Sequence, residues 1–181
     1  MSLVDVINKS FAQGIFSDQL KIAKVIPIHK QGDVTNPNNY RPISLLPTIS
    51  KVIEKIAMNR LMKHIKTHNL LTDKQHGFTA GRSTTTALIS LIEKIIDEIE
   101  NGNLVTSTFL DYSKVFDCIS HKMMRKKLQK IGVKGMANQW FKSYLENRRQ
   151  VVEVASEDGG TSRKYRSSPK NITRGVPQSS V

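Results

Sequence analysis

The chain has 181 residues, 38% of them hydrophobic, which predicts one folded domain or two small lobes and argues against a disordered protein. Its 28 Lys and Arg against 15 Asp and Glu leave a net charge of +13, typical either of a protein with a polyanionic partner such as nucleic acid or of a solvated basic surface. The single cysteine, Cys118, excludes an internal disulfide, and we expect it to be buried and without a redox role. No apolar run is long enough to span a membrane and no signal peptide is recognisable, so we expect a soluble intracellular protein.

The first elements are predicted from apolar spacing and turn residues. Apolar residues at helical spacing over 4–11 predict an opening helix that ends at Gly14. Residues 23–30, AKVIPIHK, predict a short strand, and Pro27 indicates that it lies near a sheet edge. Residues 31–42 are rich in turn formers and predict a loop.

Two further helices are expected before the middle of the chain. Ser50 is predicted to cap a helix that runs to about His64. A loop with the sequence GFTAGRS then leads into the most regular amphipathic helix of the chain. We expect that helix to begin at Ser83 or Thr84 and to end at Asn101.

The second half begins with a predicted strand. Residues 104–111 are rich in β-branched side chains and are expected to form a strand that enters a turn. The basic run HKMMRKKLQK predicts an amphipathic helix that Gly132 stops, and a second helix is expected over 136–147. Residues 151–154 and 164–166 are expected to pair as a hairpin.

Two carboxylates in the stretch FLDYSKVFDCISH are candidates for chemistry. Asp111 closes the predicted strand, and a carboxylate held there could bind Mg²⁺, which prefers oxygen ligands and keeps several waters. Asp117 falls in the next helical turn, where we expect it to stabilise the helix N-terminus or to pair with Lys114 or His121. For both, the residue spacing alone leaves an ordinary structural role open.

Basic residues in the predicted loops form the second candidate group. Lys30 and Arg41 flank the first loop, and Arg82 lies in the second. Such residues could hold a triphosphate or a nucleic-acid backbone, or they could be ordinary exposed cations. The basic run 121–130 predicts a solvated helix face, which would strengthen nucleic-acid binding if it faced a cleft that holds nucleic acid.

Five segments occur in an order typical of one enzyme family: AKVIPIHKQGD, NNYRPISLLPTISKVIEKI, QHGFTAGRSTTTAL, FLDYSKVFDCISH and TRGVPQSSV. In succession they resemble the reverse transcriptase domain of non-LTR retrotransposons, jockey-like or LINE-like. The resemblance implies an α+β, right-hand polymerase-like fold, rich in helices, with a small incomplete antiparallel sheet. It places the fingers in residues 1–103 and the first part of the palm in residues 104–181 of a single truncated domain.

The resemblance also implies an activity and roles for individual residues. The activity is RNA-directed DNA synthesis by two-metal nucleotidyl transfer, with an RNA template, a DNA primer or RNA–DNA hybrid, and deoxynucleoside triphosphates as partners, and with no obligate protein partner. Asp111 is similar to the first palm carboxylate, a Mg²⁺ ligand, and Phe116 to the aromatic that excludes a 2′-hydroxyl. Lys30 and Arg41 resemble residues that grip the triphosphate, and Gln178 resembles the glutamine beside the nucleotide and template.

The chain departs from the family pattern at three positions. Val115 stands where the family has Ala, Thr79 where it usually has Arg, and Ser179 where it has Gly. The Asp-Asp pair of the family's catalytic hairpin does not occur in the 181 residues. We therefore expect a chain cut within the palm that is inactive by itself, and two other readings stay open: a non-catalytic nucleic-acid-binding remnant, and a relic that does not fold stably.

Overall fold

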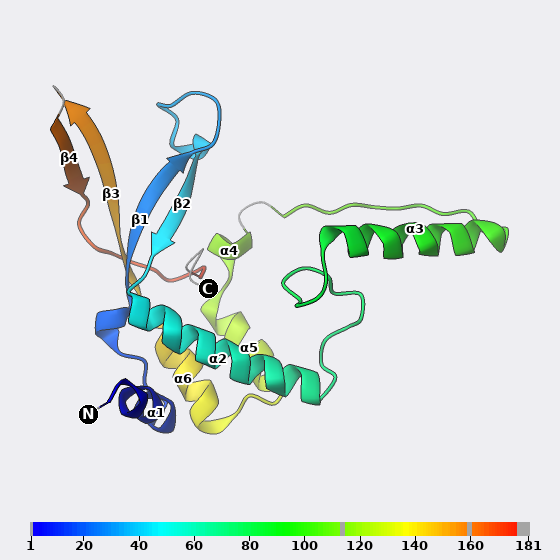
Figure 1. Cartoon of the computed structure of the whole chain (residues 1–181), viewed down its shortest axis with the longest axis horizontal. Coiled ribbons are helices and arrows are strands. Elements are labelled where there is room, and N and C mark those ends of the chain that lie inside the picture. Colours follow the sequence, from blue (N-terminus) through cyan, green and yellow to red (C-terminus); the bar gives the residue numbers. More distant parts are fainter. Residues whose placement is uncertain (1, 113–114, 159–160, 177–181) are drawn as a thin grey trace. The chain divides into compact units, whose positions relative to one another are not determined.

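A computed structural model of the chain describes residues 2–112, 115–158 and 161–176 (Figure 1). The chain divides into two compact units, Met1–Arg60 with Lys114–Val181, and Leu61–Ser113. The elements in chain order are α1 (Leu3–Gln13), η1 (Asp18–Leu20), β1 (Ile22–His29), η2 (Pro37–Asn39), β2 (Tyr40–Leu45), α2 (Thr48–Thr67), α3 (Thr84–Glu100), α4 (Val115–Cys118), α5 (His121–Lys130), α6 (Gly135–Leu145), β3 (Arg149–Asp158), β4 (Thr161–Arg166) and β5 (Lys170–Asn171).

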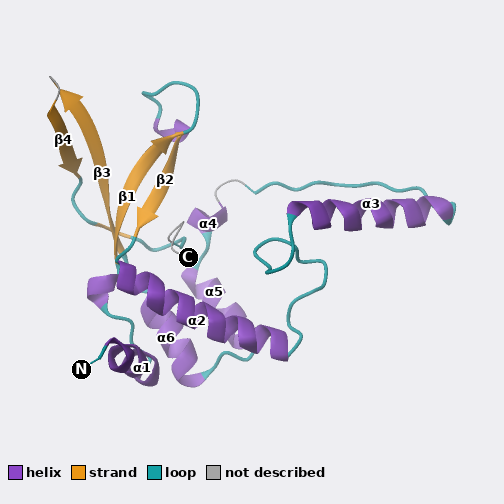
Figure 2. Ribbon diagram, viewed as in Figure 1, coloured by secondary structure: helices purple, strands orange, loops and turns teal. Residues whose placement is uncertain are grey.

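The first unit combines one sheet with helices, which confirms the α+β class (Figure 2). The strand order is β2-β1-β3-β4, with β5 paired to β3. The sheet is mixed, whereas an antiparallel one was expected, because β1 and β3 run parallel while the other pairs are antiparallel. A parallel neighbour requires a long crossover, and the chain passes through several helices between these two strands.

Strand β2 is an element that the sequence did not predict, since residues 31–42 were expected to be a loop. Its register places Arg41 opposite Ile28 and Pro42 opposite Pro27. β1 pairs with β3 only over Ile22–Val25, so at Pro27 the strand has β2 as its one described neighbour. The prediction that Pro27 lies near a sheet edge is therefore right, and the missing proline N–H costs no ladder hydrogen bond there.

The core of the first unit is built around Trp140 of α6. Its ring stacks on Phe11 of α1 at a centroid distance of 5.0 Å and meets Phe16 edge-on at 5.5 Å. The indole Nε1 donates to Ser10 Oγ at 3.0 Å, so the one polar atom of the ring is satisfied. The core cluster comprises Ile7, Phe16, Ile53, Ala57 and Trp140.

The predicted helices at both ends of this unit are confirmed. α1 begins with a capping box between Ser2 and Asp5 and ends at Gly14, whose φ is +66°. α5 and α6 cover the two helices expected around Gly132, and β3 and β4 form the expected hairpin.

The expected role of Ser50 as a helix cap is wrong. Helix α2 already begins at Thr48, which places Ser50 inside it and fully buried. Its hydroxyl donates to Oε1 of Glu54, one turn later, at 2.8 Å. Ser50 therefore forms a side-chain hydrogen bond within helix α2 and does not cap its N-terminus.

The second unit contains the amphipathic helix α3, confirmed with its predicted start. Ser83 is the N-cap, in a capping box with Thr86, and the helix ends at Asn101 before Gly102, whose φ is +77°. The strand expected over 104–111 is not formed, because that backbone makes no hydrogen bond with the described residues. β-branched residues favour a strand only where a neighbouring strand can pair with them.

Across the described parts of the chain, no helix combines the length and apolar character that crossing a bilayer requires.

Candidate functional site

A pocket of about 740 Å³ lies in the first unit, between strands β1 and β2 on one side and residues 171–176 on the other. Three cationic side chains line it: Lys30, Arg41 and Arg174. One carboxylate, Asp117, completes the charged lining, so positive charge exceeds negative charge by two.

The β1–β2 hairpin brings Lys30 and Arg41 to this pocket. The antiparallel register sets Arg41 opposite Ile28, and the Lys30 amide donates to the Asn39 carbonyl at 2.8 Å. Because side chains alternate between sheet faces, Ala23, Val25 and Pro27 line the pocket while Lys24 lies on the other face of β1. There its Nζ pairs with Glu153 Oε1 at 3.3 Å.

The loop between the two strands is held by its own polar groups. The Asp33 carboxylate accepts hydrogen bonds from the Thr35 amide and hydroxyl, each at 2.8 Å. Both bonds lower the pKa of Asp33, and the bond from the backbone amide lowers it most. The Tyr40 hydroxyl donates to the Val34 carbonyl at 2.7 Å. The loop that precedes Arg41 is thus shaped locally, as its turn-forming composition predicted.

The opposite wall is fastened to α4 by backbone contacts. The Gly175 amide donates to the Ile119 carbonyl at 2.8 Å, and the Val176 amide donates to the Phe116 carbonyl at 3.0 Å. His121 Nε2 lies 2.7 Å from the Gly175 carbonyl oxygen. Since a carbonyl can only accept, that ring nitrogen carries the proton.

Gly175 permits this close approach. Its φ is +78°, and an added Cβ would lie 2.8 Å from the Phe116 carbonyl oxygen and 2.9 Å from Asp117 Cα. Only glycine combines that φ with contact at this distance. The residue therefore sets how closely the segment bearing Arg174 approaches α4.

Asp117 lies in the first turn of α4, as expected, but the structure also places it in a pocket that the sequence did not predict. It lines the pocket together with Lys30 and Arg41, although it lies 76 residues beyond Arg41 along the chain. Of its two expected partners, His121 also contacts the Gly175 carbonyl through Nε2, and Lys114 lies outside the described residues.

The remaining predicted residues lie outside the pocket or outside the described part of the chain. Phe116 is exposed on α4 and does not line the pocket, and Cys118, expected to be buried, is exposed because α4 is a single short turn. Asp111 is exposed in the second unit, in a segment without secondary structure. Gln178 lies outside the described residues.

Ser179 also lies outside the described residues, and Arg82 reaches Asp73 at 3.8 Å within the second unit. Arg174 was missed as a site residue, although it stands in the quoted segment TRGVPQSSV. Within the described ranges, no three His, Cys, Asp or Glu side chains gather in a way that could hold a metal ion.

Comparison with known proteins identifies the family of this chain. Residues 28–181 match the family described as Reverse transcriptase (RNA-dependent DNA polymerase). The chain belongs to the reverse transcriptase family. The match includes Lys30, Arg41, Asp117 and Arg174, so the whole charged lining of the pocket falls within the family domain.

Similar proteins come from mobile elements, which confirms the resemblance to non-LTR reverse transcriptases. The chain is 34% identical over 92% of its length to a probable RNA-directed DNA polymerase from transposon BS of Drosophila melanogaster. It is 32% identical over 97% of its length to the RNA-directed DNA polymerase from mobile element jockey of the same organism. A Pol polyprotein of the type-1 retrotransposable element R2 of Popillia japonica is 26% identical over 83% of the chain.

The chain spans only a small part of these relatives. It covers 17% of the transposon BS protein, 18% of the jockey protein and 20% of the R2 protein.

Proposed function

We propose that the pocket lined by Lys30, Arg41 and Arg174 receives the triphosphate of an incoming deoxynucleotide in RNA-directed DNA synthesis. The observation that supports this most directly is the convergence of three cations from segments far apart in the sequence. Charged hydrogen bonds to phosphate are each worth about 1.5–3 kcal/mol, so two or three of them suffice for a specific anion site.

The chemistry of each cation suits a different part of this task. The planar guanidinium groups of Arg41 and Arg174 match phosphate oxygens in bidentate geometry, while Lys30 supplies a flexible point charge. Asp117 repels free phosphate, and this favours a ligand whose charge is partly neutralised by a bound cation. A metal-complexed triphosphate has that property.

The metal-binding role of Asp111 is part of this proposal. Reverse transcriptases generally depend on divalent metal ions, and Mg²⁺ prefers six oxygen ligands. In the described part of the chain, no three His, Cys, Asp or Glu side chains, with Asp111 among them or elsewhere, gather in a way that could hold a metal ion. The described residues therefore do not by themselves make up a two-metal site.

The other roles belong to the same proposal. Phe116 would exclude a 2′-hydroxyl, Gln178 would lie beside the nucleotide and template, and residues 1–103 and 104–181 would form the fingers and the first part of the palm. The sheet contains strands from both of these ranges, since β1 and β2 precede residue 103 and β3 to β5 follow it.

The experiment measures binding of Mg²⁺–dTTP to the whole chain by calorimetry. We expect the Lys30→Gln/Arg41→Gln variant to bind at least about tenfold more weakly, because two charged contacts to phosphate are lost. The matched control is Lys51→Gln/Lys55→Gln on α2, which removes the same charge at residues that line neither pocket and form no ion pair with a described residue. Equal weakening by both variants would show that only the overall charge matters and would refute the site.

Catalysis is tested separately. With a primed RNA template, Mg²⁺ and all four deoxynucleoside triphosphates, we expect no primer extension by this chain alone. Extension that Asp111→Ala abolishes would contradict that expectation and would establish Asp111 as catalytic.

A further inference from the structure

A second pocket, of about 510 Å³, opens between α5 and α6 in the first unit. Three cationic side chains line it: Arg125 of α5, Lys134 directly before α6, and Lys142 of α6. None of them lines the pocket of Lys30 and Arg41. The described residues therefore line two basic pockets that share no residue.

Gln129 and Asn138, which line the second pocket, hold it through hydrogen bonds that connect α6 with α5 and with the residues between the two helices. Gln129 Nε2 of α5 donates to Asn138 Oδ1 of α6 at 3.4 Å, and Asn138 Nδ2 donates to the Val133 carbonyl at 3.3 Å. Asn138 is buried, so these bonds fix the spacing of the two helices. The cations thus line a pocket whose amide side chains are held by hydrogen bonds.

The positive charge of this pocket is only partly compensated. Glu146 lies 3.9 Å from Arg125 Nη1 and 4.0 Å from Lys142 Nζ, and it is about half exposed, so both ion pairs are weak. Lys134 pairs with no described acid. Three cations against one carboxylate leave an excess of two positive charges.

Arg125 also has a donor without an acceptor. Its Nε is buried and makes no hydrogen bond to a described residue. Leaving a buried N–H without an acceptor costs about 1–3 kcal/mol. An anionic oxygen bound in the pocket would supply that acceptor.

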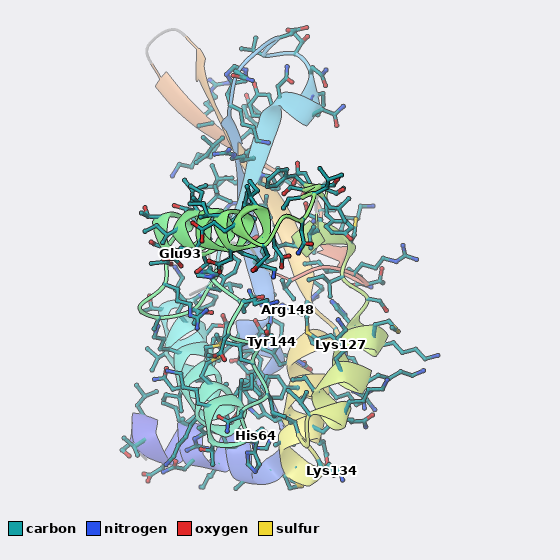
Figure 3. All side chains as sticks on the ribbon, turned by 90° about the vertical axis from the view of Figure 1, so that its right-hand side faces the viewer. His64, Glu93, Lys127, Lys134, Tyr144 and Arg148 are labelled. Carbon is teal, nitrogen blue, oxygen red and sulfur yellow. The ribbon has the colours of Figure 1, made fainter. Side chains whose placement is uncertain are left out.

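The positive charge continues along α5. Residues 118–145 contain seven Lys or Arg and no Asp or Glu. Lys122, Lys126 and Lys130 are exposed at intervals of four residues, which places them about 6 Å apart along the helix axis. Lys127, labelled in Figure 3, is another exposed lysine of α5. The three cations of the pocket and the row of Lys122, Lys126 and Lys130 on α5 together are named the α5–α6 surface.

We propose that the α5–α6 surface binds the phosphate backbone of an RNA or DNA strand, outside the pocket of the incoming nucleotide. An extended row of cations suits a polymer with regularly spaced phosphates better than it suits a single small anion. The site does not depend on the proposed nucleotide pocket, since it shares no residue with it.

The test measures binding of a fluorescent single-stranded RNA of about 20 nucleotides to the full chain by anisotropy, between about 50 and 200 mM salt. Lys134→Gln/Lys142→Gln removes two cations of the pocket, and Lys51→Gln/Lys55→Gln on α2 removes the same charge elsewhere. Each phosphate contact on a single strand contributes about 0.7 to the slope of log K against log salt. We therefore expect the pocket variant to lower the slope by about 1.4 and the affinity by roughly tenfold, and the control to leave the slope unchanged.

Three results would overturn this proposal: no RNA binding by the unchanged chain at the lowest salt, equal effects of the two variants, or no effect of the pocket variant. Anionic lipid vesicles are measured in parallel, and a loss confined to vesicle binding would assign the surface to a membrane instead. Binding of Mg²⁺–dTTP by the pocket variant separates this proposal from the previous one. We expect the pocket variant to bind Mg²⁺–dTTP as the unchanged chain does. Loss of both Mg²⁺–dTTP binding and RNA binding would point to a folding defect, which circular dichroism would detect.

Discussion

Replacing Gly175 by Ala tests whether the wall of the first pocket depends on contact between backbones. The added Cβ would lie 2.8 Å from the Phe116 carbonyl oxygen, and 2.9 Å from both Asp117 Cα and its carbonyl oxygen. These are backbone atoms, so no side-chain rotation relieves the contact. A non-glycine residue at φ +78° costs about 1–2 kcal/mol, and overpacking adds about 1–3 kcal/mol.

We therefore expect Gly175→Ala to lower the free energy of unfolding by about 2–5 kcal/mol in urea, followed by circular dichroism. Gly135 is the matched control in the same unit, because its φ is +55° but no described atom outside its chain neighbours and its own helix backbone lies within 4 Å of an added Cβ. Gly135→Ala should cost only the conformational term, about 1–2 kcal/mol. Equal losses in the two variants would refute the role of close approach at Gly175.

Two further predictions concern other parts of the fold. Burial, and then the negative charge of Glu54, raise the pKa of Tyr144 from its ordinary value of 10.0 to about 12, against the opposing positive charge of Arg148 (Figure 3). Because the folded state holds the Tyr144 proton more tightly than the unfolded state does, the protonated hydroxyl contributes its full stabilisation below pH 10. That contribution is lost as the pH rises from 10 to about 12. Between these values the wild-type chain should lose about 2–3 kcal/mol of stability that Tyr144→Phe does not lose, and parallel urea unfolding curves for the two proteins would contradict this. Ser83→Ala removes the hydroxyl that accepts from the Thr86 amide at 3.2 Å, and should destabilise helix α3 by about 0.5–2 kcal/mol. The loss would be measured as lower protection of the α3 amides in hydrogen exchange, and protection equal to that of the unchanged chain would refute the cap.

Local signals in the sequence predicted most of the helices. Ser83 and Asn101 bound α3 where capping chemistry and apolar spacing placed its ends, and Gly14 ends α1 as expected. These signals succeed because a helix forms its hydrogen bonds between residues four apart, so residues close in the sequence determine where it begins and ends. The hairpin of β3 and β4 was predictable for a similar reason, since its two strands are close together in the sequence.

Strands with distant partners were harder to predict. β2 was missed because Pro42 and the preceding turn formers resemble a loop, and only pairing with β1 shows it to be a strand. Residues 104–111 show the opposite error, since their composition favours a strand but no described backbone pairs with them. β propensity is weak without a neighbouring strand.

By itself the sequence determined the family, through five segments in a characteristic order, and it identified Lys30 and Arg41 as candidates for phosphate binding. Only the tertiary structure showed that Arg174 and Asp117 line the same pocket as these two residues. It alone showed that Gly175 brings that wall against α4. The reason is physical: residue type and spacing report local geometry, whereas a binding site depends on sheet register and close backbone contacts between distant segments.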